Sequence, residues 1–247
     1  EISACLVGSE MCIRDRLEEV HNKLADFVKP GISTLEIDQF GEKAIRDLGC
    51  VPNFLNYNGY PASICVSVND EVVHGIPSKD RILQDGDIVS LDAGLIHEGY
   101  HSDAARTHAV GNISEEAKRL IEVTKQSFFE GIKLAVPGNH LFDISEAIQK
   151  YVESNGYSVV RDLVGHGIGT HLHEDPQIPN FKQRRKGMKL RPGMTLAIEP
   201  MVNEGSYDVV WLDDDWTVVT EDGSLAAHYE NTIVITEDGC EILTLSE

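Results

Sequence analysis

Basic residues, paired cysteines and long apolar runs are all scarce in this sequence. Only 21 Lys and Arg stand against 41 Asp and Glu, which gives a formal net charge of −20 over 247 residues. Nucleic acids and anionic membranes are bound through basic surface, so neither is expected as a partner. No run of about eighteen apolar residues is present to span a bilayer, and no signal peptide is recognisable at the N-terminus. These absences predict a cytoplasmic protein.

The cysteines do not form a recognisable framework. They number five, at Cys5, Cys12, Cys50, Cys65 and Cys240, and no two of them have CxxC spacing. An odd, scattered set of this kind indicates neither a disulfide scaffold nor a zinc site built from thiolates. Isolated thiols are therefore expected.

The first sixteen residues, "EISACLVGSEMCIRDR", differ from the rest of the chain. They mix Gly, Cys and charged residues without the period of a helix or of a strand. We expect 1–16 to be a non-native N-terminal segment and 17–247 to form a single domain, although a frayed native terminus is the alternative. With 41% hydrophobic residues, the chain is long enough to bury a substantial core.

From Leu17 onward, helical patterns and then strand patterns occur twice. Capping boxes and Pro-Gly or Asn-Gly stops predict helices over 17–28, from Ser33 to 49, from Ser114 to 135, and from Asp143 to 155. Alternating apolar residues predict strands over 63–69, 87–94, 103–111, 157–165, 194–202, 215–222 and 230–239. This order predicts an α+β fold in one compact unit, with two halves that resemble each other in structure.

One predicted hairpin contains a feature that should destabilise it. In "SLDAGLIHEGYHSDAART", a turn centred on His97 and Glu98 would place Asp92 directly opposite Asp103, on the same face of the sheet. Two opposed carboxylates repel each other. A bound cation would make this arrangement favourable.

Five further ionisable residues occupy apolar or Gly-rich surroundings: His74, His166, His173, Glu199 and Glu230. A buried carboxylate requires a cation, a proton or several hydrogen bonds. Together with the aspartates, these residues make an oxygen and nitrogen donor set without thiolate, which suits a pair of ions such as Mn, Fe or Co. Taken singly, each glutamate could instead mark a strand end at the surface, and each histidine could be a hydrogen-bonded core residue.

The motifs "HGIP", the Asp92 and Asp103 pair, "GHGIG" with "HEDP", "IEPMV" and "YENTIVIT" occur in this order from Leu17 to Leu245. Their order and spacing closely resemble those of the type I methionine aminopeptidases. The resemblance implies the pita-bread fold, in which two related α+β halves form a curved antiparallel sheet backed by helices. It also implies a metal-dependent hydrolase that removes the N-terminal methionine from peptides and nascent chains, preferring a small second residue.

The resemblance implies roles for the residues that match its motifs. Asp92 would bind one of two divalent metal ions (Co, Mn, Fe or Zn), Asp103 and Glu230 would bridge both ions, and His166 and Glu199 would bind the other. Glu199 would also accept a proton from the attacking water. His173 would stabilise the developing oxyanion, and His74 would contact the scissile amide nitrogen.

A pocket for the methionine side chain follows from the same resemblance. It would be lined by Tyr57, Tyr60, Cys65, Leu172 and Trp216, with Phe54 beside them. Aromatic and sulfur groups suit a flexible thioether. Leu172 and Phe54 stand where the best-known bacterial members carry Phe and Cys, which keeps the pocket apolar and puts its shape in doubt. Plain core packing is the alternative reading for Tyr57 and Phe54.

The remaining histidines of these segments, His97, His101, His108 and His171, match no family role and are expected at the surface. The resemblance allows the ribosome as a further partner of a protein expected to act as a monomer. Three other functions stay open: an aminopeptidase P or prolidase-like X-Pro peptidase, a non-catalytic relative that binds peptides or ribosomes, and a metal phosphatase or nuclease. The last ranks lowest because no Arg or Lys cluster accompanies the motifs.

Overall fold

The structure is a computed structural model that describes residues 3–245, with side chains from residue 15 onward. Within those residues it contains the helices α1 (Ser3–Phe27), α2 (Thr34–Asp47), α3 (Glu115–Ile132) and α4 (Leu141–Ser154), and the 3₁₀ turn η1 (Tyr57–Gly59). Its strands are β1 (Val51–Pro52), β2 (Ile64–Val68), β3 (Glu71–Val73), β4 (Ile88–His97), β5 (Tyr100–Ala109), β6 (Ser158–Val159), β7 (Gly165–Gly167), β8 (Glu174–Ile178), β9 (Thr195–Ile198), β10 (Met201–Asn203), β11 (Val209–Trp211), β12 (Val218–Thr220), β13 (Ala226–His228), β14 (Glu230–Ile235) and β15 (Cys240–Ile242). The predicted order of two helices followed by strands, twice over, is confirmed.

Local sequence signals explain where three of the helices begin. Ser33 caps α2 in a capping box with Glu36, and the Ser114 side chain accepts a hydrogen bond from the Ala117 backbone at the start of α3. The predicted start of α4 at Asp143 is wrong. The helix is capped at His140, whose backbone N–H donates to the Asp143 carboxylate over 2.9 Å, so Asp143 is the third helical residue rather than the cap.

The first helix begins earlier than predicted. The backbone is helical from Ser3, so 3–16 continue the helix expected over 17–28. The absence of a helical period in this stretch is therefore no guide to its backbone. That 1–16 is non-native and that 17–247 forms one domain stay predictions. No helix among residues 3–245 combines the length and apolar character needed to cross a membrane.

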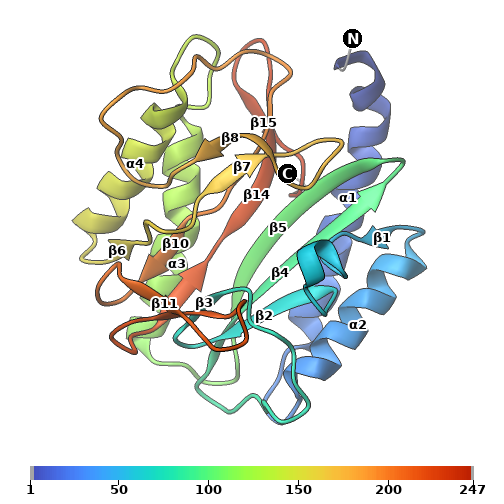
Figure 1. Cartoon of the computed structure of the whole chain (residues 1–247), viewed down its shortest axis with the longest axis vertical. Coiled ribbons are helices and arrows are strands. Elements are labelled where there is room, and N and C mark those ends of the chain that lie inside the picture. The colour runs from blue at the N-terminus through green and yellow to red at the C-terminus, as the bar shows by residue number, and fades with distance from the viewer. Residues whose placement is uncertain (1–2, 246–247) are drawn as a thin grey trace.

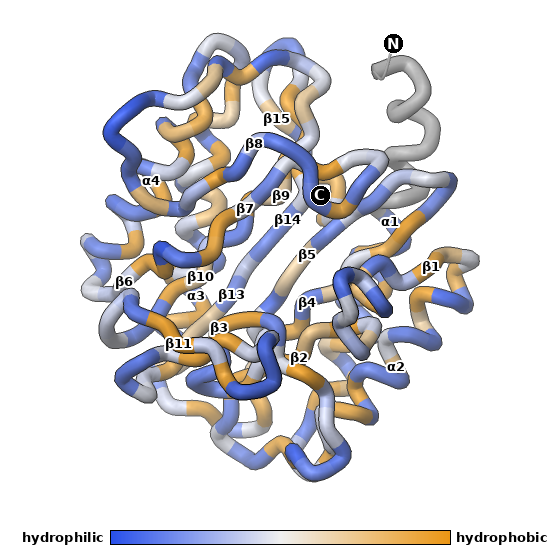
Figure 2. The backbone as a smooth tube through the Cα atoms, viewed as in Figure 1, coloured by the Kyte–Doolittle hydropathy of each residue, from blue (hydrophilic) through white to orange (hydrophobic). Residues whose placement is uncertain are grey.

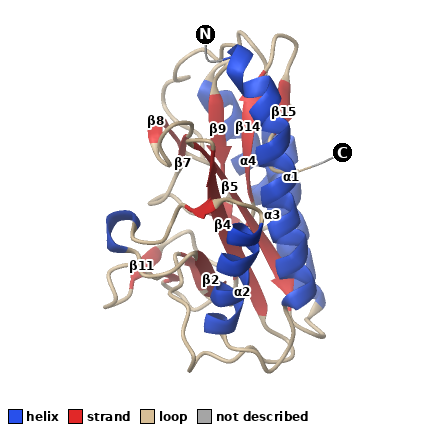
Figure 3. Cartoon of the chain, turned by 90° about the vertical axis from the view of Figure 1, so that its right-hand side faces the viewer, coloured by secondary structure: helices blue, strands red, loops and turns tan. Residues whose placement is uncertain are grey.

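A large antiparallel sheet runs through the molecule. Its strands lie in the order β1-β4-β5-β14-β9-β7-β8, with β2 also paired to β4 and β15 to β14. The long β4–β5 hairpin crosses the centre (Figure 1). From the side, α1, α3 and α4 lie along one face of this sheet, whereas η1, β8 and β11 lie toward the opposite face (Figure 3). The predicted antiparallel sheet backed by helices is confirmed.

Each pair of helices has its own apolar core against the sheet. The tube of α2 alternates between hydrophilic and hydrophobic residues, as expected for a helix with one buried face (Figure 2). The core of the first half includes Leu24, Ile37, Ile64 and Leu91, and that of the second half includes Phe128, Ile144, Leu196 and Ile233. Two α+β halves with separate cores therefore meet where β5 pairs with β14.

Two predicted strands are interrupted. The segment predicted as one strand over 194–202 forms β9 and β10 on either side of Glu199 and Pro200. Proline has no backbone N–H to donate to a ladder, so the strand stops there and β10 joins a different sheet. The strand predicted over 157–165 shortens to β6 at Ser158–Val159, and β7 follows at Gly165–Gly167.

The hairpin histidines are not at the surface, contrary to prediction. His97, His101 and His108 are partly buried, because the loop over 168–173 contacts one side of the hairpin and α1 and α3 contact its strands. The His101 backbone N–H, for example, donates to the Gly169 carbonyl oxygen over 2.8 Å. His171 is exposed as predicted, with 79% of its side chain accessible.

Acid should destabilise the fold partly through His108. Burial, and then the neighbouring Arg106 charge, lower its pKa from 6.5 to about 4. The folded state therefore holds this imidazole neutral, and stability is retained above pH 6.5 and lost as the pH falls toward 4. Between about pH 7.5 and pH 5, His108→Gln should reduce the acid-induced loss of unfolding free energy by about 2 kcal/mol, measured by urea denaturation. The same change at exposed His171 is the control and should leave that loss unaltered.

Candidate metal centre and active site

The β4–β5 hairpin has a different register from the one predicted. His97 pairs with Tyr100, so the two-residue turn is Glu98–Gly99, and both of these residues have positive φ (51° and 85°). Such a turn matches the twist of the flanking strands. Asp103 consequently pairs with Gly94, and Asp92 pairs with Ala105. The prediction that the two aspartates are directly opposed is wrong, but a shift of two residues keeps both on one face.

That face is the floor of a cavity of about 70 Å³. Eleven of the twelve predicted site residues line it, together with Phe54; they are Tyr57, Tyr60, Cys65, His74, Asp92, Asp103, His166, His173, Glu199, Trp216 and Glu230. Leu172 does not line the cavity, but it is buried in the same apolar cluster as Phe54 and Tyr60. Residues from both halves of the sequence therefore converge on one site.

The acidic side chains gather where the two halves join. One ligand atom from each of Asp103, His166 and Glu230 lies within 4.8 Å of the other two. Sheet pairing explains this contact, because β14 pairs with β5 at Glu230 and Ala105 while β9 and β7 follow on its other side. Glu199, at the break after β9, has an oxygen 3.7 Å from the His166 Nε2 atom.

Three of these buried carboxylates have an oxygen atom that lacks a hydrogen-bond partner. Asp92 Oδ1, Asp103 Oδ1 and Glu230 Oε1 are buried and accept no hydrogen bond. Burial raises the pKa of Asp92 to about 7. Burial also raises the pKa values of Asp103, Glu199 and Glu230 well above the usual range, and the neighbouring carboxylates add to each shift. Because the charged forms of these buried carboxylates are unfavourable on their own, the cluster requires a compensating positive charge. Its oxygen and nitrogen donors suit a divalent cation.

His166 is arranged to present a lone pair to this cluster. Its Nδ1 lies 2.8 Å from the Gly167 carbonyl oxygen, to which it can donate, and this leaves Nε2 toward Glu199 as an acceptor. Burial lowers the pKa of His166 to about 4, with a further contribution from His173. A neutral imidazole fixed through its second nitrogen is the usual form of a metal-ligating histidine.

The two other predicted histidines lie at the rim of the cluster. His173 Nδ1 is 2.8 Å from the Tyr57 hydroxyl, and its ring centroid is 4.1 Å from that of His166. His74 follows β3 with a positive φ of 60° and faces the edge of the Trp216 ring. Burial, and then the proximity of His173, lower the pKa of His74 to about 4. Both histidines can therefore donate one N–H from a neutral ring.

The backbone beside His74 leaves no room for a larger residue. A Cβ atom on Gly75 would lie 2.3 Å from the Val66 carbonyl oxygen, and the Val66 N–H donates to the Gly75 carbonyl over 3.0 Å. Gly75→Ala should lower the unfolding free energy by about 2 to 3 kcal/mol, because two backbones must separate. Urea denaturation measures this loss. The control is Gly239→Ala, where nothing lies within 4 Å of the added Cβ, and an equal loss in that variant would contradict the argument.

One end of the cavity is apolar. The Tyr60 hydroxyl donates to the Gly75 carbonyl over 2.8 Å, and its ring meets the Trp216 ring edge-on at 5.1 Å. Trp216 is held by Asp214, whose carboxylate accepts the backbone N–H groups of Trp216 and Thr217 at 2.9 and 2.8 Å. Together with Cys65, these rings make a wall suited to an unbranched apolar side chain.

His228 was missed by the sequence reasoning. It is buried, and its Nε2 lies 3.8 Å from Glu199 Oε2 and 3.9 Å from Glu230 Oε2. Glu199, His228 and Glu230 form a second group whose ligand atoms lie within 4.8 Å of one another. The signal was present in "HYE", because residues two apart in an extended chain point to the same side.

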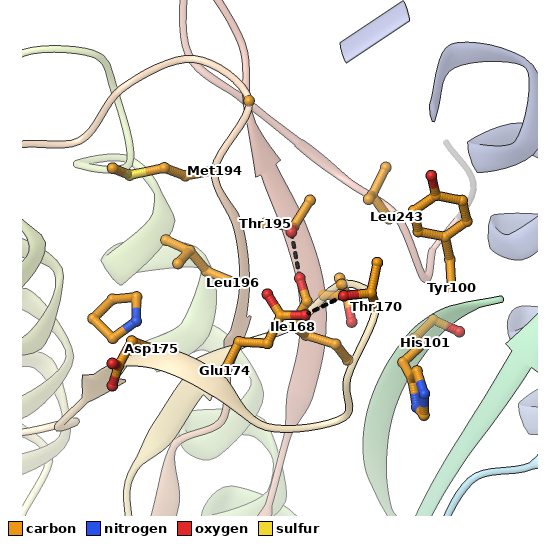
Figure 4. A pocket seen from close by; sticks show the side chains of 15 residues that line it. Tyr100, His101, Ile168, Thr170, Glu174, Asp175, Met194, Thr195, Leu196 and Leu243 are labelled. Atoms are coloured by element: carbon orange, nitrogen blue, oxygen red, sulfur yellow. Dashed lines mark hydrogen bonds between the residues drawn. The ribbon is translucent and has the colours of Figure 1, made fainter. Parts of the chain in front are cut away.

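A larger cavity of about 260 Å³ lies beside this site and contains none of its predicted residues. Part of its wall is the loop that leads into β8, where the Glu174 carboxylate accepts a hydrogen bond from the Thr170 hydroxyl (Figure 4). Met194, Leu196 and Leu243 make much of it apolar. Size alone therefore does not distinguish the two cavities, whereas the convergence of acids and histidines sets the smaller one apart.

Comparison with known proteins agrees with this geometry. Residues 13–237 match the metallopeptidase family M24. A methionine aminopeptidase of Clostridium acetobutylicum is 58% identical over 229 residues, covering 93% of this chain and 92% of that protein. Methionine aminopeptidase 1 of Bacillus subtilis is 56% identical over 224 residues, covering 91% of this chain and 90% of that protein.

Solved structures give the same result. The crystal structure of methionine aminopeptidase from Thermotoga maritima superposes with a TM-score of 0.93 at 45% identity, covering 96% of this chain and 95% of that one. The Rickettsia prowazekii enzyme gives 0.92 at 43% identity, covering 95% of each chain. The predicted pita-bread fold is confirmed. Because the site residues converge in one cavity and the similarity extends over nearly the whole chain, we conclude that the chain belongs to the metallopeptidase family M24.

Proposed function

We propose that the protein is a metal-dependent aminopeptidase that removes the N-terminal methionine from peptides and nascent chains, with a preference for a small second residue. The observation that carries this proposal is that one cavity combines an acidic floor with an apolar end. Its relatives at 56–58% identity bear the name methionine aminopeptidase, which supports the same activity here. The apolar end, lined by Tyr60, Cys65 and Trp216, suits an unbranched apolar side chain.

Five residues are proposed to hold two divalent ions of Co, Mn, Fe or Zn. Asp92, Asp103, His166, Glu199 and Glu230 would hold these ions, with Asp92 toward one ion, His166 and Glu199 toward the other, and Asp103 and Glu230 between them. The buried, unpartnered oxygens of Asp92, Asp103 and Glu230 fit this assignment. When bound, such ions lower the pKa of water and polarise the carbonyl group of the substrate.

The surrounding side chains perform the proton transfers and fix the substrate. Glu199, which lines the cavity with an oxygen 3.7 Å from the His166 Nε2 atom, is proposed as the general base toward water. His173, oriented by the Tyr57 hydroxyl, donates to the carbonyl oxygen as negative charge develops on it. His74 donates to the amide nitrogen that becomes the leaving amine. The apolar end formed by Tyr60, Cys65 and Trp216 receives the methionine side chain.

The test is release of free methionine from Met-Ala-Ser by metal-stripped protein to which Mn, Fe or Co is returned without oxygen. Metal-dependent release is the expected result. Leu-Pro-Pro is included because X-Pro peptidases have the same fold; the Xaa-Pro dipeptidase from Bacillus anthracis gives a TM-score of 0.76 at 24% identity. Cleavage of Leu-Pro-Pro alone would assign the protein to that activity, and no turnover by folded protein would favour a non-catalytic binding role.

The proposed activity also bears on the location of the protein and on its partners. The expected substrate, nascent chains, fits a cytoplasmic location and contact with the ribosome, and the protein is proposed to act as a monomer. The acidic balance of the chain makes direct contact with ribosomal RNA unfavourable. A single domain over 17–247, preceded by a non-native segment, is part of the same proposal.

A further inference from the structure

Exposed apolar side chains concentrate on one hairpin. Among the described residues, seven large hydrophobic side chains are exposed, and four of them lie in one short segment: Tyr207, Val210, Trp211 and Leu212. Trp211 is the largest, with 49% of its surface accessible. Single exposed apolar residues are ordinary, but a cluster of this kind marks an interaction surface. We call Tyr207–Leu212 the rim segment.

The rim segment includes an edge strand that leads to the active site. β11 lies at the edge of the three-stranded sheet β11-β12-β3. In this sheet Trp211 pairs with Val218, and Val218 pairs with Val73, which directly precedes His74. Neighbouring strands lie about 4.8 Å apart, so Trp211 is about 10 Å from the backbone beside His74. An extended peptide covers that distance in about three residues.

The same hairpin turn serves both the cavity and the rim. The Leu212 N–H donates to the Thr217 carbonyl over 2.9 Å, and the Asp215 N–H donates to the Leu212 carbonyl over 3.1 Å. Trp216, inside this turn, lies against Tyr60 and His74, whereas Leu212 is exposed to solvent. The rim segment is therefore continuous with the side of the cavity at which the leaving amine is expected.

Acidic residues predominate along the rim segment, and the Arg161 guanidinium lies over the Tyr207 ring, 3.7 Å from its centroid. From 204 to 222 the sequence "EGSYDVVWLDDDWTVVTED" contains seven acidic residues and no Lys or Arg. A second copy of the chain would bring another seven negative charges to the same place, and nucleic acid would bring phosphates, so both are disfavoured. A peptide with apolar and basic residues has the complementary chemistry.

A strand added to the free edge of β11 would lie one further strand spacing away, about 14 Å from β3, a distance that an extended peptide covers in about four residues. We propose that the edge strand β11, with Val210, Trp211 and Leu212, binds the substrate chain from about the fourth residue beyond the cleaved bond, and that it favours apolar and basic residues there. The extended substrate adds to the strand edge through its backbone, and Trp211 and Leu212 cover its apolar side chains. The acidic residues attract its lysines or arginines. This proposal rests on the proposed function, since it concerns the same substrate.

The test compares three peptides: Met-Ala-Ser, Met-Ala-Ser-Leu-Lys-Val-Lys and Met-Ala-Ser-Leu-Glu-Val-Glu. The basic heptapeptide should have a kcat/KM about tenfold above that of the tripeptide, through a lower KM, and the acidic one should show no gain. Raising the salt concentration should reduce the gain, because exposed charges are screened.

Trp211→Ser should lower kcat/KM for the basic heptapeptide by about tenfold and leave Met-Ala-Ser unchanged. Asp213→Asn should reduce only that part of the gain in kcat/KM for the basic heptapeptide that added salt also removes. Met188→Ser, which alters an exposed apolar residue elsewhere, is the matched control and should change neither. Equal rates for the tripeptide and the basic heptapeptide, or equal losses on both in Trp211→Ser, would overturn the proposal.

Binding of the product peptide Ala-Ser-Leu-Lys-Val-Lys, measured by calorimetry, separates this proposal from the proposed function. Binding that Trp211→Ser weakens supports the docking surface even if no peptide is cleaved. Cleavage of Met-Ala-Ser without such binding leaves the aminopeptidase activity intact and refutes the docking surface. A concentration-dependent dimer abolished by Trp211→Ser, with unchanged peptide kinetics, would also refute it and assign the rim segment to self-association.

Discussion

Replacing Asp103 by asparagine should lower methionine release from Met-Ala-Ser by at least about 10³-fold. A carboxylate oxygen of Asp103 lies within 4.8 Å of a ligand atom of His166 and of one of Glu230. A metal ion bound among these three side chains would therefore contact Asp103. Asparagine keeps the shape of the side chain but loses the negative charge and one acceptor oxygen. A steady-state assay with saturating Mn²⁺ measures the loss.

The same substitution should separate metal binding from folding. Burial and the neighbouring Asp92 raise the pKa of Asp103, so the metal-free protein gains nothing from the charge of this carboxylate. The metal-free variant should therefore melt at the same temperature as the unaltered protein or higher. At a hundred times its Kd, added metal should stabilise the unaltered protein by about 2.7 kcal/mol, and this gain should be lost in Asp103→Asn. A variant that keeps both activity and metal-induced stabilisation would show that Asp103 is not a ligand.

His173→Ala should lower kcat by about 10² to 10³-fold with little change in KM. The imidazole lies at the rim of the acid cluster, where it can donate to an oxygen that becomes negative only during reaction. An interaction made mainly in the transition state affects kcat rather than substrate binding. Steady-state kinetics with Met-Ala-Ser give both constants.

Tyr57→Phe provides a graded control for this prediction. It keeps the ring but removes the hydroxyl that lies 2.8 Å from His173 Nδ1, so the imidazole loses an orienting contact and stays in place. We expect a loss of about tenfold in kcat, between the unaltered protein and His173→Ala. If His173→Ala raised KM alone, the histidine would be a substrate-binding residue and not an oxyanion donor.

The residues of the site were predictable from sequence because each departs from its surroundings. A carboxylate or histidine in an apolar strand or a Gly-rich turn needs a partner, and this requirement identified Asp92, Asp103, Glu199 and Glu230 before their contacts were known. Their mutual positions were less accessible. They depend on β14 pairing with β9 and also with β5, and the β14–β5 pairing joins residues more than a hundred positions apart.

The errors have local physical causes. The hairpin register depended on which two residues carry positive φ, and glycine at 99 favoured Glu98–Gly99 over the predicted His97–Glu98. The strand over 194–202 was predicted as continuous because its apolar pattern outweighed the missing N–H of Pro200. His228 was not considered, because it directly precedes the motif "YENTIVIT" and its contacts with Glu199 and Glu230 form only in the folded chain.

Diffraction from crystals soaked in Mn²⁺, with anomalous data collected near the manganese edge, tests the central claim most directly. The account predicts strong anomalous peaks among Asp92, Asp103, His166, Glu199 and Glu230, each within about 2.0 to 2.4 Å of ligand oxygens or nitrogens. Peaks confined to other side chains, or no peak in this cavity at saturating Mn²⁺, would contradict it.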